Sequence, residues 1–167
     1  MKAAWMVALA CIAATAGAAR AHDDAHVGHT SPSASAKAPR QTAFGIAGTS
    51  SKATRTIDIA MSDDMRFDPA SITVATGQTV RFRVANKGHA QHEMVIGTMA
   101  GLREHGAMMR AMPGMSHDEA YVAHVAPGAT GEIVWTFNRP GEFHFACLVP
   151  GHMEAGMIGN IVVKPRA

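Results

Sequence analysis

Short runs in which apolar and polar side chains alternate recur through most of the chain. The clearest run is residues 80–84, where Val80, Phe82 and Val84 alternate with two arginines, as in a β-strand with one buried face. Similar short strands are predicted at residues 56–61, 71–74, 93–96, 121–125, 133–137, 142–147 and 161–163. Turn-forming glycines and prolines separate them. This pattern predicts an all-β domain, built as a two-sheet antiparallel β-sandwich.

One segment departs from the alternation. Between residues 98 and 120 the apolar side chains recur at spacings of three and four, which predicts a helix at residues 99–109. This short helical insertion is rich in methionine and histidine. Two interpretations of its methionines stay open. In one, Met108, Met112 and Met115 hold an extra copper ion, since thioethers favour Cu(I). In the other, which we favour, they pack the helix onto the sandwich.

The N-terminal region differs in composition. Residues 1–21 have the features of an export signal peptide: Lys2, an apolar stretch and the small-x-small sequence Ala19-Arg20-Ala21. The apolar stretch is shorter than the ~20 residues of a membrane span, so no stable membrane insertion is expected. Residues 22–53, rich in Ala, Ser, Thr, Gly and Pro, are predicted to be a flexible linker. The single folded domain is expected at residues 54–167.

Charge and composition narrow the classes of partner. Removal of Lys2 and Arg20 with the signal leaves 15 − 2 = 13 basic residues against 13 acidic ones, so the exported chain is nearly neutral. It lacks the basic surface of a nucleic-acid-binding protein. The sequence contains 10 histidines and 12 methionines, and only Met1 and Met6 leave with the signal. Imidazole and soft sulfur together favour copper over magnesium or calcium.

The segment from Cys147 to Met157 favours metal binding. Cys11 leaves with the signal, so Cys147 is the only cysteine of the exported chain, and an unpaired thiol in an oxidising compartment is reactive unless it is buried or bound. The segment from Cys147 to Met157 places a thiolate, the imidazole of His152 and a thioether at a strand end and in the following loop. Two histidines, a cysteine and a weak axial methionine are the ligands of a type 1 copper site.

The second histidine of such a site is expected to come from elsewhere in the chain. His92 stands just before a predicted strand and fits this role. We expect it to reach the site from a distant strand on the other side of the core. The sequence therefore predicts one copper ion on His92, Cys147, His152 and Met157.

These residues resemble a known family. Residues 141–147, with His152 and the sequence Gly-Met-Ile-Gly at 156–159, are similar to the C-terminal copper loop of the cupredoxins, the plastocyanin/azurin family. Residues 91–96 look like the family's upstream histidine strand. The resemblance covers residues 54–164 and is closest to periplasmic cupredoxins associated with copper tolerance. It implies a Greek-key sandwich.

The chain departs from the family pattern in two places. Many members carry asparagine after the upstream histidine, where its side chain ties the two ligand loops together, whereas this chain has Glu93. Four residues separate Cys147 from His152, against two in plastocyanins. The colour and potential of the site depend on such surrounding hydrogen bonds.

Other metal sites fit the sequence less well. Structural zinc prefers two or more cysteines and seldom takes thioether. A binuclear copper centre needs a second cysteine between Cys147 and His152, and multicopper oxidases need several His-x-His pairs; the sequence has neither. Alternation places His144 on the opposite face from the Cys147 sulfur, and His89 is expected to be solvated. The N-terminal histidines are interpreted as a disordered tail or, alternatively, a weak auxiliary copper site: His22, His26 and His29.

The predicted function follows from this site. Copper held by four protein ligands leaves little room for a substrate, so we expect an electron carrier and not an enzyme. The edge of His152 is the predicted docking point for an unidentified periplasmic redox partner, within an apolar rim: Pro150, Gly151, Met153, Ala155 and Gly156. The alternative is a copper-sequestering or copper-delivery protein that uses the extra histidines and methionines.

Overall fold

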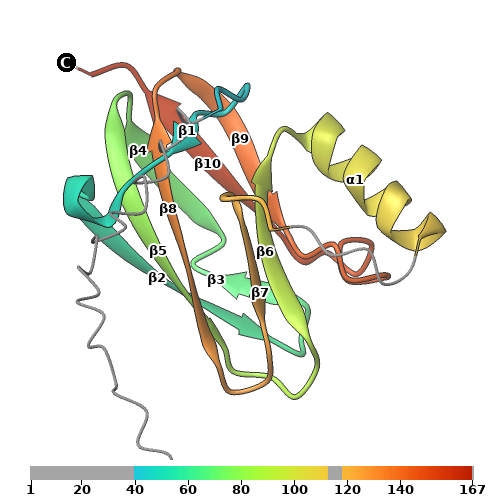
Figure 1. Cartoon of the computed structure of the whole chain (residues 1–167). Helices are drawn as coiled ribbons and strands as arrows, with labels where there is room; N and C mark the ends of the chain where they lie inside the picture. The colour runs from blue at the N-terminus through green and yellow to red at the C-terminus, as the bar shows by residue number, and fades with distance from the viewer. Residues whose placement is uncertain (1–39, 113–117, 167) are drawn as a thin grey trace, which may run out of the picture. The chain divides into compact units, whose positions relative to one another are not determined.

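The computed structural model describes residues 40–112 and 118–166. Within these residues, two five-stranded sheets and one α-helix form the domain (Figure 1). The strand orders are β1-β8-β5-β2-β3 in the first sheet and β4-β10-β9-β6-β7 in the second. The strands are β1 (Ile46–Ala47), β2 (Arg55–Ser62), β3 (Arg66–Asp68), β4 (Ser71–Ala75), β5 (Gln78–Asn86), β6 (His92–Gly97), β7 (Val122–Val125), β8 (Thr130–Phe137), β9 (Gly141–Ala146) and β10 (Ile158–Lys164).

The predicted two-sheet sandwich is confirmed, but both sheets are mixed. β2 runs parallel to β5, and β10 runs parallel to β4, while the other strand pairs are antiparallel. The expectation of wholly antiparallel sheets is therefore wrong for these two pairs. The chain passes from the first sheet to the second at β4 and returns at β5. Strands that become neighbours after such a crossing have directions that side-chain alternation does not encode.

The core lies between the two sheets, and the alternation along β5 follows it. Val80, Phe82 and Val84 are fully buried. The intervening arginines lie on the other face, where Arg81 pairs with Glu132 at 3.5 Å and Arg83 with Asp58 at 3.3 Å. Burial of apolar side chains on one face of a strand is the main stabilising contribution in such a sandwich.

Helix α1 (Met99–Ala111) lies against β6 and β9 of the second sheet (Figure 1). Thr98 caps the helix, since its hydroxyl accepts a hydrogen bond from the Gly101 N–H at 3.1 Å. Leu102 packs with Val95, Ala146 and Leu148 in a second apolar cluster. Every residue of β6 is consequently buried, on both faces. No helix in the described part of the chain is long and apolar enough to cross a membrane.

Two methionines of this segment are exposed: Met108 in the helix and Met112 at its C-terminal cap. Leu102 and Gly106 are the buried residues of the helix, whereas 41% of Met108 and 44% of Met112 are exposed. The packing interpretation is therefore wrong for these two side chains. The buried positions lie four apart on one face of the helix, and Met108 falls off that face. Met115 lies outside the described residues.

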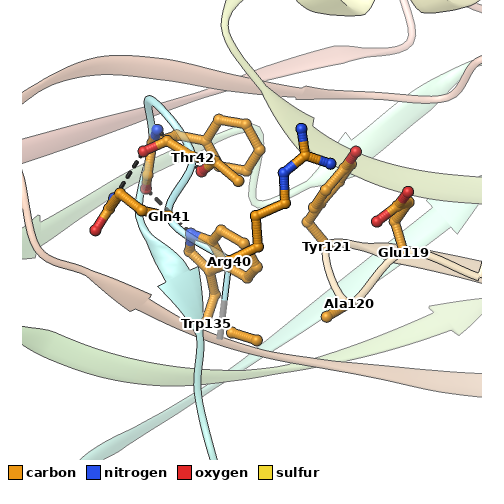
Figure 2. Close-up of a pocket in the computed structure, with 9 residues that line it drawn as sticks. Arg40, Gln41, Thr42, Glu119, Ala120, Tyr121 and Trp135 are labelled. Atoms are coloured by element: carbon orange, nitrogen blue, oxygen red, sulfur yellow. Dashed lines mark hydrogen bonds between the residues drawn. The ribbon is translucent and has the colours of Figure 1, made fainter. Parts of the chain in front are cut away.

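The folded domain begins before the predicted boundary at Thr54. β1 pairs with β8, a 3₁₀ turn covers Ser50–Lys52, and the Phe44 ring stacks on Trp135 at a centroid distance of 5.2 Å. The Trp135 indole N–H donates to the Phe44 carbonyl at 3.0 Å. Figure 2 shows the pocket around Trp135, of about 210 Å³. The linker prediction is thus wrong for residues 40–53, because their polar composition conceals the few apolar side chains that reach the core. The remainder of the predicted linker and the signal peptide lie outside the described residues.

Replacing Phe44 with alanine is expected to lower the free energy of unfolding by about 3 kcal/mol, because the change leaves a cavity against Trp135. Urea unfolding of the metal-free domain measures the effect. Lys52→Ala, an exposed change in the same segment, should alter stability by less than about 0.5 kcal/mol. Equal stability of the two variants would show that the segment does not belong to the core.

Candidate metal centre

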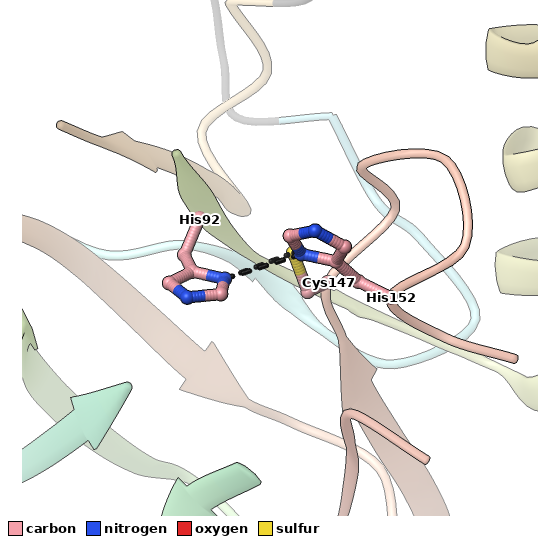
Figure 3. A group of neighbouring side chains, drawn as sticks. All are labelled: His92, Cys147 and His152. Carbon is pink, nitrogen blue, oxygen red and sulfur yellow. Dashed lines mark hydrogen bonds between the residues drawn. The ribbon is translucent and has the colours of Figure 1, made fainter. Parts of the chain in front are cut away.

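Three of the predicted ligands converge on one point at the end of the second sheet. His92, Cys147 and His152 each direct one donor atom to a common region, and these atoms lie within 4.8 Å of one another. The two Nδ1 atoms are 3.2 Å apart, and the Cys147 Sγ lies 3.3 Å from Nδ1 of His152 and 3.9 Å from Nδ1 of His92. Figure 3 shows both imidazoles turned toward the sulfur.

Strand alternation and register bring His92 and Cys147 together. His92 begins β6 and points to the same face as Met94 and Ile96, which are in the main core. Cys147 follows β9 and belongs to the same core. β6 and β9 are hydrogen-bonded neighbours, with Val95 opposite Ala146. The expectation that His92 comes from the other side of the core is therefore wrong: it comes from the adjacent strand of the same sheet.

The loop between β9 and β10 carries the remaining predicted ligands. The Cys147 N–H donates to the Met157 carbonyl at 3.1 Å, and the Met157 N–H donates to the His152 carbonyl at 3.0 Å. These bonds close the loop at its base and pair the backbone of Met157 with that of Cys147. Met157 is fully buried and belongs to the same core cluster as Cys147.

The separations and the donor types fit a bound copper ion. Imidazole and thiolate bind first-row metals such as zinc at about 2.0–2.3 Å, which places trigonal donors roughly 3.5–3.7 Å from one another. The observed separations of 3.2, 3.3 and 3.9 Å scatter around these values. A set of two imidazoles and one thiolate is that of blue-copper sites.

The metal-free site keeps its thiol protonated and its outer histidine neutral. Burial raises the pKa of the Cys147 thiol to about 11, although the Glu93 N–H donates to its sulfur at 3.4 Å. Burial, and next the neighbouring His92, lower the pKa of His152. A metal ion that binds the sulfur must therefore displace the thiol proton, whereas the lowered pKa of His152 favours its neutral, metal-binding form.

The carboxylate of Glu93, the residue after His92, contacts the other ligand segment of the site and, with its second oxygen, a further histidine. Its Oε1 accepts a hydrogen bond from the Leu148 N–H at 3.1 Å, one residue after Cys147. Its Oε2 lies 2.8 Å from Nδ1 of His124 on β7, and only 4% of Glu93 is exposed. The carboxylate thus makes a tie between the segments where the sequence departs from the asparagine of many cupredoxins. His124 carries no signal in the sequence, since it stands opposite Glu93 only through the register of β6 and β7.

Two other histidines near the site do not point toward the Cys147 sulfur. His144 lies between the inward-facing Phe143 and Phe145, on the opposite face from the Cys147 sulfur, as alternation predicts. The His89 side chain is 99% exposed, in agreement with the expectation of a solvated residue. Its Nδ1 nevertheless lies 3.2 Å from a carboxylate oxygen of Asp63, a residue that sequence analysis did not single out.

The sequence profile of the family described as copper binding proteins, plastocyanin/azurin family, matches residues 53–164. The chain belongs to this family. Copper is accordingly the metal of this cupredoxin, and the metal centre described above lies within the matched region.

Two relatives of this chain are both copper-resistant cuproproteins named CopI. The copper-resistant cuproprotein CopI of Rubrivivax gelatinosus is 52% identical over 158 residues, which are 94% of this chain and 95% of the relative. The copper-resistant cuproprotein CopI of Vibrio cholerae serotype O1 is 36% identical over 118 residues, 70% of each chain. The similarity therefore extends well beyond the copper loop.

Solved structures place this cupredoxin beside the auracyanins. Reduced auracyanin from Roseiflexus castenholzii has 27% identity and a TM-score of 0.57, over 68% of this chain and 99% of that chain. Auracyanin A from Chloroflexus aurantiacus, described as a "blue" copper protein, has 29% identity and a TM-score of 0.52, over 65% and 98% respectively. These likenesses agree with the two-sheet sandwich of the domain.

Proposed function

We propose that this cupredoxin is a periplasmic type 1 copper protein that transfers single electrons and contributes to copper tolerance. The convergence of His92, Cys147 and His152 carries the proposal. Met157 is proposed as the weak axial ligand, and residues 1–21 as the export signal. Bound copper supplies a one-electron Cu(II)/Cu(I) couple.

The surroundings of the ligands suit a carrier better than a catalyst. Cys147 and His92 have no exposed surface, so a substrate has no direct approach to either donor. His152 alone of the three is partly exposed, and it stands in a loop that faces solvent. Its edge is the proposed exit for the electron. The flanking Pro150, Gly151 and Ala155 are exposed, which suits brief docking of a redox partner.

The link with copper tolerance rests on similarity along the whole chain. The Rubrivivax gelatinosus relative, named for copper resistance, covers 94% of this chain at 52% identity. A role in protecting the cell from copper is compatible with the same four ligands, because a site that changes oxidation state readily can take part in copper oxidation as well as in electron transfer.

A second candidate function, copper capture by the methionine-rich segment, is favoured by the exposure of Met108 and Met112. Exposed thioethers are available to Cu(I), whereas buried ones are not. The other residues proposed for extra copper lie outside the described part of the chain: Met115, His22, His26 and His29. In this alternative the protein sequesters or delivers copper without a dedicated redox partner.

The proposed site is tested by replacing Met157 with leucine. The variant should keep copper and its visible absorption but have a higher reduction potential, since a weak axial donor stabilises Cu(II) more than Cu(I). Each tenfold loss of relative Cu(II) affinity raises the potential by about 59 mV for a one-electron couple. Spectroelectrochemical titration measures the shift. Unchanged potential would exclude Met157 as a ligand, and a couple that is not reversible in either protein would contradict the carrier function.

A further inference from the structure

A carboxylate stands behind the buried ligand His92. Asp63 follows β2, and its Oδ1 lies 3.3 Å from the Nε2 of His92. The other ring nitrogen of His92, Nδ1, faces the sulfur of Cys147 and the ring of His152. His92 has no exposed surface, and a buried ring nitrogen needs a hydrogen-bond partner. Asp63 is that partner for Nε2, where other proteins use water or a backbone carbonyl.

We propose that Asp63 is the positioning residue for His92: it accepts the Nε2–H, so that the bare Nδ1 points at the metal, and its charge favours Cu(II) over Cu(I). The part of this inference that concerns copper rests on the proposed function. A carboxylate on the outer nitrogen of a metal-binding histidine fixes the tautomer and ring orientation and makes the imidazole a stronger donor.

Asp63 is itself held in place by the loop that precedes β6. Its Oδ2 accepts a hydrogen bond from the His89 N–H at 2.8 Å, and its Oδ1 accepts one from the Ala90 N–H at 3.1 Å. Gly88 is needed beside it, because a Cβ at that position would lie 2.1 Å from Oδ1. The carboxylate therefore has little freedom to rotate away from His92, and its position is set before any metal binds.

The same loop is anchored to the core by a buried amide. The Asn86 side chain, 1% exposed, donates to the Ala90 carbonyl at 2.8 Å and to the Val125 carbonyl at 2.9 Å. Its oxygen accepts from the Gly88 N–H at 2.9 Å. The loop that binds Asp63 is thus hydrogen-bonded, through Asn86 of β5, to β5 and β7. These fixed hydrogen bonds distinguish Asp63 from an ordinary surface carboxylate, because a carboxylate without fixed partners could not hold the His92 ring in one orientation.

The charge of Asp63 acts on the oxidation states unequally. Its side chain is 41% exposed, and it is ionised at neutral pH as aspartates ordinarily are. Cu(II) carries one more positive charge than Cu(I), so a fixed negative charge behind His92 stabilises the oxidised form more. Partial exposure of Asp63 to water weakens this attraction. It does not remove it, because the His92 ring between the carboxylate and the metal position is buried and excludes water there.

The first test uses the metal-free protein, so that it does not depend on copper. Nitrogen-15 NMR of the His92 ring should show one tautomer, protonated at Nε2, in the wild type. The Nδ1-protonated tautomer, or comparable amounts of both, would overturn the inference even if the protein binds copper normally. Failure to bind copper would instead contradict the proposed function and leave this measurement intact.

The second test removes the charge and keeps the shape. Asp63→Asn should lower the affinity for Cu(II) by about 10–100-fold, the usual effect of losing such a partner, and should lower Cu(I) affinity less. Asp64→Asn is the matched control: it removes the same charge one residue away, and Asp64 has no hydrogen bond or ion pair within the described residues. Competition titrations with both oxidation states measure the affinities. Equal effects of the two variants would overturn the proposal; should Asp63→Asn fail to fold, the tautomer measurement still decides it.

Discussion

Replacing Cys147 with serine should abolish the intense visible absorption of the copper-loaded protein. That absorption arises from charge transfer between a thiolate and Cu(II), and Cys147 is the free cysteine of the described domain. A serine hydroxyl is a harder donor that does not ionise at neutral pH, so copper binding should also weaken substantially. Absorption spectra of the wild type and the variant, loaded with one equivalent of Cu(II), measure the loss.

The control for this change lies on β9, the strand that leads to Cys147. His144→Gln alters a residue three positions before Cys147, but on the face that points away from the sulfur. This variant should keep the spectrum of the wild type. Copper binding to the wild type should also release the thiol proton, because burial raises the pKa of Cys147 to about 11. A Cys147→Ser protein that kept the visible absorption would show that the sulfur is not a ligand.

Replacing the four clustered methionines with leucine should separate electron transfer from copper capture. We expect the wild type to bind more than one Cu(I), and the variant, altered at Met108, Met109, Met112 and Met115, to lose only the excess. Leucine conserves apolar volume but cannot bind copper, and Met108 and Met112 are exposed, so the fold should be retained. Cu(I) titration with a chromophoric chelator measures the stoichiometry.

The same variant also has an expected effect in cells. It should keep the type 1 spectrum while failing to restore copper tolerance to a strain that lacks the gene. Met61→Leu, in the fully buried core, is the control and should change neither property. Full copper tolerance together with unchanged Cu(I) stoichiometry would leave the methionines without a role in copper capture.

Local sequence determined much of the metal centre. Cys147 and His152 stand at the start of one short loop between two strands, so their proximity needs only the hairpin-like closure that the backbone hydrogen bond between Cys147 and Met157 provides. The strands themselves were predictable for the same reason: burial of one face imposes alternation, as at Val80, Phe82 and Val84. The helix at Met99–Ala111 was predicted almost to its last residue from its spacing.

Tertiary structure alone decided what lies around those residues. Three features arise from chain crossings between the sheets, which no local pattern records. They are the pairing of the His92 strand with the strand before Cys147, the parallel pairing of β2 with β5, and the contact of Asp63 with His92. Phe44 was missed because one aromatic ring in a polar segment has no period. The exposure of Met108 likewise depends on where the sheet meets the helix. Local patterns specify which face of an element is buried, whereas only the packed fold specifies which side chains meet across elements, because that depends on contacts distant in sequence.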